Sequence, residues 1–153
     1  MILVTLGTQK QPFPRLLDYI EKANIKDEII VQSGPVEYKN KNMKFIGLVD
    51  MDEYDKLIDK SDFVIAHGGT GSVISALKKQ KKIIACARIT KYHEAVDDHQ
   101  EELVSNFASE GYLLELTDEN NLADLVKELK RFKPKKFKSN QKKFIEKLIN
   151  TLK

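Results

Sequence analysis

The sequence predicts an α/β protein with a doubly wound, mainly parallel sheet. Six short apolar runs alternate with segments whose apolar residues recur every three or four positions, as on one face of a helix. Three polar or glycine-rich segments directly follow apolar runs. They would lie beyond the carboxyl ends of the strands, where an open parallel sheet binds its ligands. A composition of 41% hydrophobic and 32% charged residues is typical of a globular protein.

The six predicted strands are short runs of apolar, mostly β-branched residues. The first run ends at Gly7-Thr8, and Ser33-Gly34-Pro35 closes the second; both sequences favour a turn. The runs span Ile2–Leu6, Glu28–Gln32, Met43–Val49, Phe63–Ala66, Ile83–Ala87 and Tyr112–Leu116.

Five further segments have the apolar spacing of amphipathic helices. Pro14 suits the first turn of the first helix, and Gly111 suits the position just after the fourth. With 153 residues and 17.5 kDa, the chain has the size of one ordinary domain, which we assign to residues 1–132. The predicted helices cover Leu16–Ile20, Met51–Asp59, Ser72–Lys78, Asp97–Ala108 and Leu122–Leu129.

The C-terminal segment is strongly basic, in contrast to the rest of the chain. Residues 127–153 contain eleven Lys or Arg and two acids, so this segment carries +9 and residues 1–126 carry −6. We expect residues 133–153 to form a basic amphipathic helix packed on the same domain. Its lysines could then face anionic lipid or a partner near the membrane. Nucleic acid is the weaker alternative, because no binding motif accompanies the basic residues. One helical face of this segment would carry Phe137, Gln141, Phe144, Ile145, Leu148, Ile149 and Leu152.

The chain's cysteine content and its first residues favour a cytoplasmic protein. Cys86 is the single cysteine and lies in an apolar run, so we expect a buried, inert thiol and no internal disulfide. The opening MILVTLG lacks the basic start and cleavage site of a signal peptide and is better interpreted as a strand. No segment approaches the roughly 20 apolar residues that span a bilayer.

The stretch from Phe63 to Ser75, FVIAHGGTGSVIS, is the strongest candidate for a binding site. An apolar strand is followed by His67 and by three glycines in four residues, and a helix starts there. Glycines let the backbone turn tightly and approach a ligand. Free N–H groups and the positive end of the helix dipole then favour a phosphate at this position.

The absence of several familiar motifs argues against other chemistries. The chain has no GxGxxG after its first strand, no GxxxxGK[ST], no GxSxG and no HExxH. His93, Asp97, Asp98 and His99 could together supply metal ligands. We favour the simpler interpretation that this is a polar loop running into a helix N-terminus, where Asp97 and Asp98 are favourable, and we predict no metal site.

Three parts of the chain carry a family resemblance. The loop His67–Ser72 at a helix start is followed by Asp97-Asp98-His99-Gln100, and the opening VTLGTQKQPFPRLL is similar to the signature V-T-x-G-T with Q-P-F-x-R-L. In these features the chain resembles the Rossmann-like, donor-binding half of GT-B glycosyltransferases of the family 28 type. The resemblance covers residues 1–129. It is closest to small one-domain subunits, both of the split N-acetylglucosaminyltransferase that acts on a dolichol-linked acceptor and of bacterial exopolysaccharide glycosyltransferases.

The resemblance implies a set of donor-binding residues. His67 and the backbone of the glycine loop would hold the donor diphosphate, with Thr8 beside them. Asp98, His99 and Gln100 would contact sugar or ribose hydroxyls, for which carboxylate and amide groups are natural partners. For His67 the alternative is a structural strand-end histidine, and for the acidic segment it is helix capping, which we favour for Asp97. The whole set is Gly7, Thr8, His67, Gly68, Gly69, Thr70, Gly71, Ser72, Asp98, His99 and Gln100.

The same resemblance implies inverting transfer of a sugar from a UDP-sugar, without a further cofactor, to a lipid-linked or polysaccharide acceptor. The general base and the acceptor groove would belong to a membrane-anchored partner subunit, which would recruit the chain to the inner face of the membrane. One departure affects the ribose contact, because Ser75 stands where many relatives carry Glu.

Rival interpretations stay open at this point. A non-catalytic nucleotide-sugar-binding module would bind UDP without turnover. A membrane-surface or nucleic-acid adaptor would bind through the basic C-terminal segment alone. An epimerase on the same fold is less favoured, since such enzymes carry both domains in one chain.

Overall fold

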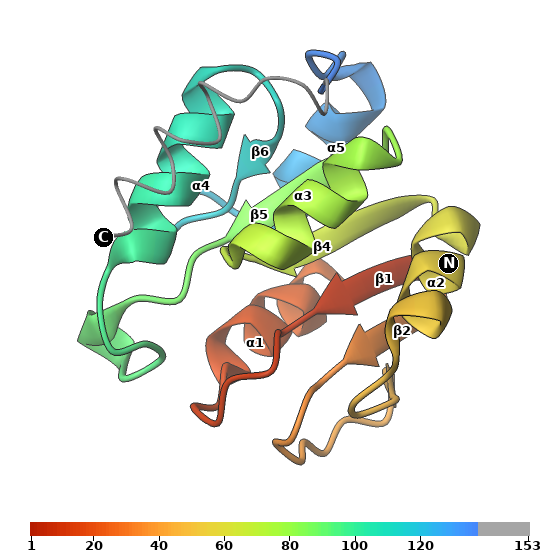
Figure 1. Ribbon diagram of the computed structural model, residues 1–153, viewed down its shortest axis with the longest axis vertical. Coiled ribbons are helices and arrows are strands. Elements are labelled where there is room, and N and C mark those ends of the chain that lie inside the picture. Colours follow the sequence, from red (N-terminus) through yellow and green to blue (C-terminus); the bar gives the residue numbers. More distant parts are fainter. Residues whose placement is uncertain (138–153) are drawn as a thin grey trace.

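The computed structural model describes residues 1–137 and contains one six-stranded sheet in which every strand pair is parallel (Figure 1). The strand order is β3-β2-β1-β4-β5-β6, so the chain starts in the middle of the sheet and winds outward twice. This confirms the predicted doubly wound α/β fold. The strands are β1 Ile2–Thr5, β2 Ile29–Gln32, β3 Lys44–Phe45, β4 Phe63–His67, β5 Ile83–Cys86 and β6 Leu114–Glu115.

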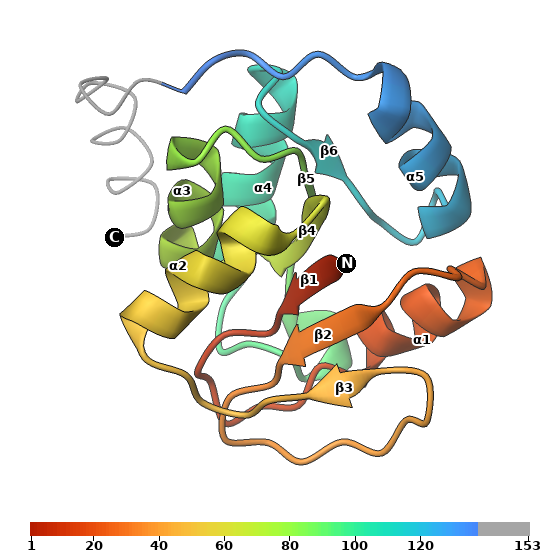
Figure 2. The ribbon, with the colours of Figure 1, turned by 90° about the vertical axis from the view of Figure 1, so that its right-hand side faces the viewer.

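Helices cover both faces of the sheet, in the three layers that Figure 2 shows edge-on. On one face, α2, α3 and α4 pack on a core that includes Leu3 and Val64. On the other, α1 and α5 pack on a core that includes Ile2 and Val4. Neighbouring residues of β1 thus enter opposite cores, as the period of two along a strand requires. The helices are α1 Pro14–Ala23, α2 Met51–Lys60, α3 Thr70–Lys78, α4 His99–Ser109 and α5 Leu122–Arg131, with a short 3₁₀ turn at Thr90–Tyr92.

The two outermost strands are shorter than the sequence predicts. Strands β3 and β6 contain two residues each, whereas the apolar runs there suggested seven and five. Each has a hydrogen-bonded neighbour on one side only. Met43 and Leu116 are still buried, although they lie outside the paired residues. The apolar runs therefore predicted correctly which residues are buried, but they overestimated how many residues pair with a neighbouring strand.

Because all strands are parallel, the segments that follow β1, β4 and β5 lie at one edge of the sheet. This confirms that Gly7-Thr8, the glycine loop and the segment 88–98 share the carboxyl edge. Residues 133–137 have no regular secondary structure, and the rest of the predicted C-terminal helix lies outside the described residues. Phe137 is buried, with its ring centroid 5.8 Å from that of Tyr112. Within residues 1–137, no helix has the length and apolar character needed to cross a membrane.

Candidate functional site

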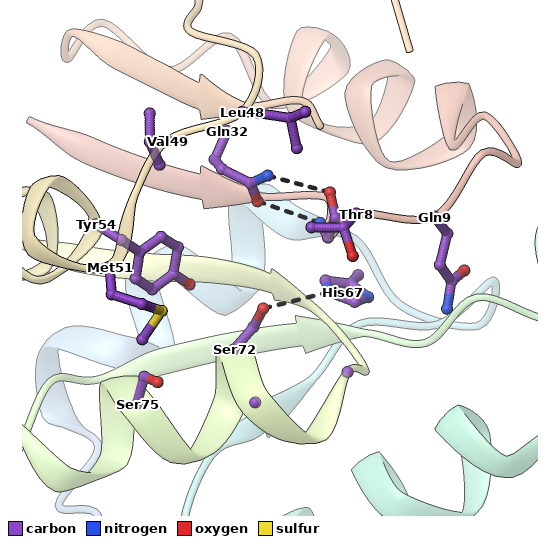
Figure 3. Close-up of a pocket in the computed structure, with 13 residues that line it drawn as sticks. Thr8, Gln9, Gln32, Leu48, Val49, Met51, Tyr54, His67, Ser72 and Ser75 are labelled. Atoms are coloured by element: carbon purple, nitrogen blue, oxygen red, sulfur yellow. Dashed lines mark hydrogen bonds between the residues drawn. The ribbon is translucent and has the colours of Figure 1, made fainter. Parts of the chain in front are cut away.

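A cavity of about 350 Å³ opens at the carboxyl edge, between the segments that follow β1, β3 and β4 (Figure 3). Its lining contains no Asp, Glu, Lys or Arg side chain. Any charge on a ligand would therefore be met by backbone dipoles and neutral side chains. The lining residues are Gly7, Thr8, Gln9, Gln32, Leu48, Val49, Met51, Tyr54, His67, Gly69, Gly71, Ser72 and Ser75.

His67, the last residue of β4, is 4% exposed and lies between two glycines. A Cβ atom added to Gly7 would lie 2.6 Å from His67 Nε2, and one added to Gly69 would lie 2.7 Å from the same atom. Gly7 also has φ +81°, which side chains rarely adopt. Glycine is therefore required at both positions to leave room for the imidazole ring.

The imidazole of His67 is neutral at physiological pH. Burial lowers its pKa to about 4, the positive charge of Arg88 acts in the same direction, and the Gln100 side chain opposes them. His67 Nε2 lies 3.3 Å from Ser72 Oγ, while Nδ1 has no hydrogen-bond partner in residues 1–137. His67 therefore contributes no positive charge to the cavity.

The start of α3 supplies the positive potential that the side chains lack. Its N-cap is Gly69, and no side chain caps the first turn. Gly69, Gly71 and Ser72 all line the cavity, so unpaired N–H groups and the positive end of the helix dipole lie at its wall. An anion such as a phosphate group is favoured at this position.

Gln32 holds the opposite wall in place, and the sequence analysis missed it. Its Oε1 accepts from the Gly7 N–H at 3.2 Å, and its Nε2 donates to the Gly7 carbonyl at 3.1 Å. The side-chain amide thus pairs with the backbone of Gly7, two positions past the end of β1, and Gln32 is only 5% exposed. The available signal was a lone amide ending a buried apolar strand.

The far end of the cavity is apolar, and sequence analysis missed this wall as well. Leu48, Val49, Met51 and Tyr54 come from the segment after β3 and from the first turn of α2. Leu48 and Met51 are 64% and 66% exposed. The sequence placed these residues in a strand and on a helix face, and it held no sign that they would face a cavity.

The structure divides the predicted site residues into two groups. Gly7, Thr8, His67, Gly69, Gly71 and Ser72 line the cavity, whereas Gly68, Thr70, Asp98, His99 and Gln100 do not. A Cβ on Gly68 would lie 2.8 Å from Val104 Cγ2, so this glycine allows α4 to pack against the loop. Asp98 Oδ1 accepts from the Thr90 N–H at 2.8 Å. The role of each residue in ligand binding stays a prediction.

The polar segment 88–98 is held by a buried ion pair. Arg15 donates to both carboxylate oxygens of Glu94 at 2.9 Å and to the Ala87 carbonyl at 2.9 Å. Glu94 is 2% exposed. Asp118 joins this network, because it accepts from the hydroxyls of Tyr19 and Tyr92 at 2.5 and 2.6 Å. The segment is thereby fixed to α1 and to the loop before α5.

The remaining chemical candidates have structural roles. Cys86 is buried as predicted, and burial raises the pKa of its thiol to about 12, so the reactive thiolate is strongly disfavoured. Asp97 accepts from the His99 N–H at 3.1 Å, as expected for a residue at a helix start. In the described part of the chain, no three His, Cys, Asp or Glu side chains are grouped as metal ligands would be.

Comparison with known proteins identifies several relatives. The UDP-N-acetylglucosamine transferase subunit ALG13 of Candida glabrata is 30% identical over 108 residues, covering 69% of this chain and 51% of that protein. ALG13 of Saccharomyces cerevisiae is 33% identical over 75 residues, covering 48% and 35%. The chain spans about half the length, 51%, of the first of these curated relatives and less of the second.

Solved structures share the fold. The NMR solution structure of ALG13 has a TM-score of 0.63 at 21% identity, and the match covers 98% of this chain and 95% of that one. The crystal structure of the glycotransferase of kitacinnamycin has a TM-score of 0.58 at 18% identity, covering 98% of this chain and 37% of that one. These likenesses show that the chain shares the α/β fold of both structures.

A family model extends over nearly the whole sequence. The model of the glycosyltransferase family 28 C-terminal domain matches residues 1–152. The match includes the glycine loop, the start of α3 and every segment that lines the cavity. The chain therefore belongs to the glycosyltransferase family 28 C-terminal domain family.

Proposed function

We propose that this chain binds a UDP-sugar and acts as the donor-binding, catalytic subunit of a two-component inverting glycosyltransferase. The observation that carries the proposal is the glycine-lined cavity at the start of α3, where Gly69, Gly71 and Ser72 present an uncapped helix N-terminus. Such a site suits a diphosphate. The family and the names of the ALG13 relatives, which are UDP-N-acetylglucosamine transferase subunits, support a UDP-sugar as the ligand that carries the diphosphate.

The two ends of the cavity suggest how the donor lies in it. The diphosphate would lie against the start of α3, with hydrogen bonds from Thr8, Ser72 and neutral His67. The nucleoside would extend toward Leu48, Val49 and Met51, where a flat base finds apolar contact. Ser75, on α3, also lines the cavity, and its short hydroxyl would take the place of the Glu that the family resemblance implies for the ribose contact.

Departure of the diphosphate would be assisted by preorganised dipoles. With the donor bound as proposed, the unpaired N–H groups at the start of α3 would face the leaving diphosphate and stabilise the negative charge that grows on it. In this proposal that stabilisation, together with the hydrogen bonds of Thr8 and Ser72, takes the place of a dedicated cofactor.

The general base would come from a second, membrane-anchored subunit that also holds the acceptor. The cavity lining has no carboxylate, and a His67 with a pKa of about 4 is a weak base at neutral pH. Among residues 1–137, the exposed large apolar side chains are Leu48, Met51, Tyr92 and Val96, all in segments at the carboxyl edge. Leu48 and Met51 line the cavity itself, where such a subunit would reach the bound donor. The acceptor would be lipid-linked or a polysaccharide such as an exopolysaccharide.

In this arrangement the sugar transfer would take place at the cytoplasmic face of a membrane. The basic residues of the C-terminal segment would add peripheral contact with anionic lipid, each Lys near the surface contributing about 1 kcal/mol. Nucleic acid has no place in the proposal.

Calorimetric titration with UDP and a panel of UDP-sugars tests the donor site, using the natural chain and Gly71→Val. A Cβ on Gly71 meets no protein atom within 4 Å, so the valine would occupy cavity space without disturbing the core. We expect UDP binding by the natural chain and loss of at least about tenfold in the variant. Failure of the natural chain to bind UDP at millimolar concentration would refute the donor site.

A transfer assay tests whether the general base and the acceptor site belong to a second subunit. The purified chain alone should bind donor and transfer little, and membranes that contain the partner subunit should restore transfer. Full activity of the isolated chain would contradict a base on another subunit. Binding without transfer under every condition would favour the non-catalytic nucleotide-sugar module.

A further inference from the structure

Tyr54, in the first turn of α2, ends in a buried hydroxyl that has no hydrogen-bond partner in residues 1–137. The residue is 9% exposed, and its ring belongs to the core that also contains Leu3 and Val64. An unpaired buried hydroxyl is costly, and the great majority of buried polar groups have a partner. This hydroxyl therefore needs a partner that the described part of the chain does not supply.

The Tyr54 side chain extends to the cavity at the carboxyl edge. Tyr54 lines that cavity together with Met51 of the same helix, and Figure 3 shows its ring extending from α2 toward Ser72. Burial raises the pKa of the hydroxyl, while the nearby hydroxyls of Ser72 and Thr5 act in the opposite direction. At neutral pH the hydroxyl is thus protonated, and it can donate a hydrogen bond to a bound molecule.

The two neighbouring hydroxyls leave Tyr54 unsatisfied. Ser72 Oγ lies 3.3 Å from His67 Nε2, and Thr5 Oγ1 is itself buried without a hydrogen-bond partner in residues 1–137. Thr5 is fully buried at the end of β1 and is not part of the cavity lining, whereas Tyr54 is. Tyr54 is therefore better placed than Thr5 to contact a ligand.

The position of Tyr54 corresponds to the middle of a nucleoside diphosphate. In the proposed donor orientation, the diphosphate lies against Ser72 and the start of α3, and the base lies against Leu48 and Met51. The ribose joins these two groups in any nucleoside diphosphate, so it must lie between the two walls. Tyr54 shares a helical turn with Met51, and its ring extends toward Ser72 (Figure 3). Its hydroxyl thus lies where the ribose would be.

We infer that the Tyr54 hydroxyl forms a hydrogen bond with a ribose hydroxyl of the donor, and that it thereby selects ribonucleotides over deoxyribonucleotides. The inference rests on the proposed donor site and specifies one of its contacts. A ribose hydroxyl both donates and accepts, as a phenol hydroxyl does, whereas an ionised phosphate oxygen only accepts. A site that provides a buried polar group for a ligand hydroxyl discriminates against the analogue that lacks it.

Tyr54→Phe tests the contact, because it removes the hydroxyl and keeps the ring in the core. Calorimetric titration of the full chain would compare UDP with 2′-deoxy-UDP and 3′-deoxy-UDP. The natural chain should bind UDP about tenfold more tightly than at least one of the two analogues. Tyr54→Phe should bind UDP about tenfold more weakly than the natural chain does, and it should bind that analogue at least as tightly.

Tyr19→Phe is the matched control for this titration. It also removes a phenol hydroxyl, which in Tyr19 donates to Asp118, and neither residue lines the cavity. This variant should keep the preference of the natural chain for UDP. A preference lost equally in both variants would overturn the assignment to Tyr54.

Thermal unfolding without ligand separates a ligand contact from a structural role. Because the Tyr54 hydroxyl has no partner in residues 1–137, Tyr54→Phe should not lower the Tm of the ligand-free chain. A lower Tm together with unchanged UDP affinity would identify a structural hydroxyl and overturn the inference.

The ligand panel also separates this inference from the donor site on which it rests. An equal loss for UDP and both deoxy analogues in Tyr54→Phe would assign the contact to the phosphates or the base, and it would overturn the ribose contact. Unchanged UDP affinity in that variant would overturn the inference and leave the donor site standing, as would a natural chain that binds all three ligands alike. Failure of the natural chain to bind UDP at millimolar concentration would refute the donor site, and the inference with it.

Discussion

Two regions at the carboxyl edge of the same sheet differ in whether their polar groups already have partners within the protein. The segment 88–98 is rich in charge, and its central acid, Glu94, is paired at both oxygens with Arg15. The cavity beside it is lined by neutral residues, and the helix start at its wall, the first turn of α3, has no side-chain cap. The charged groups are therefore already paired within the protein, whereas the neutral cavity keeps hydrogen-bonding groups available for a ligand.

The difference has a physical cause. A buried charge needs a partner within the protein, because burial without one is very costly. A binding site must instead leave hydrogen-bonding capacity unused until the ligand arrives. Backbone N–H groups at a helix start provide this capacity at lower desolvation cost than a buried lysine would. The following predictions test the contrast, beginning with the largest expected change in stability.

Glu94→Ala should cause the largest loss. It removes the carboxylate that pairs with Arg15, and it also removes the acceptor of the Ile89 N–H at 3.2 Å. Breaking a buried ion pair on one side costs about 3–5 kcal/mol, because the remaining charge is left uncompensated. Urea unfolding measures the change, with exposed Glu119→Gln as the control. A loss below about 1 kcal/mol would show that the network does not hold the segment.

Acidification should weaken the fold through His67. Its pKa is about 4 in the folded chain and 6.5 when exposed, so the unfolded chain binds the proton more readily. Stability from this residue is therefore complete above pH 6.5 and declines as the pH falls toward 4. Integrated over that interval, the loss is roughly 3 kcal/mol.

Urea unfolding of the natural chain and of His67→Gln at several pH values measures this effect. The stability difference between them should shrink by that amount between pH 7 and pH 4. A difference that stays constant with pH would mean that the ring is protonated without penalty in the folded chain.

Much of the framework was predictable from the sequence, because burial leaves a direct mark on it. Apolar periodicity gave the fold class, and the glycine loop after Phe63–Ala66 predicted the helix start that lines the cavity. The edge strands were overestimated, since an apolar residue such as Met43 can be buried without pairing. The spacing of apolar residues predicts which side of a helix or strand is buried, but it does not predict where the hydrogen bonds between neighbouring strands end.

The partners of the site could not be predicted, because they depend on three-dimensional proximity. Gln32 and Gly7 are 25 positions apart, and Gln100, whose side-chain oxygen accepts from the Gly68 N–H, is 32 positions from that glycine. The sequence singled out Gln100 through a resemblance, and the contact that it makes is visible only in the structure. Arg15 and Glu94, 79 positions apart, show the same limit for the charged region.

Gly69→Ala and Gly71→Ala should change stability in opposite directions. A Cβ at Gly69 would lie 2.7 Å from His67 Nε2, so overpacking should cost about 1–3 kcal/mol. At Gly71 the Cβ meets no protein atom within 4 Å, and alanine in a helix gains about 0.5–1 kcal/mol over glycine. Thermal unfolding of both variants checks the prediction, and equal effects would contradict the assigned ring position.

Of the destabilising changes, Ser72→Ala should have the smallest effect on stability, and it should have a selective effect on binding. It removes the 3.3 Å contact between Ser72 Oγ and His67 Nε2, for which a loss of about 0.5–1.5 kcal/mol is expected. Ser72 lines the cavity, so UDP should lose a hydrogen bond as well and bind about five- to tenfold more weakly. Ser105→Ala is the control, because its hydroxyl donates to Glu115 and neither residue lines the cavity. If both variants lower stability alike and neither alters UDP affinity, the neutral wall does not serve the ligand, and the contrast between the two regions would be one of composition alone.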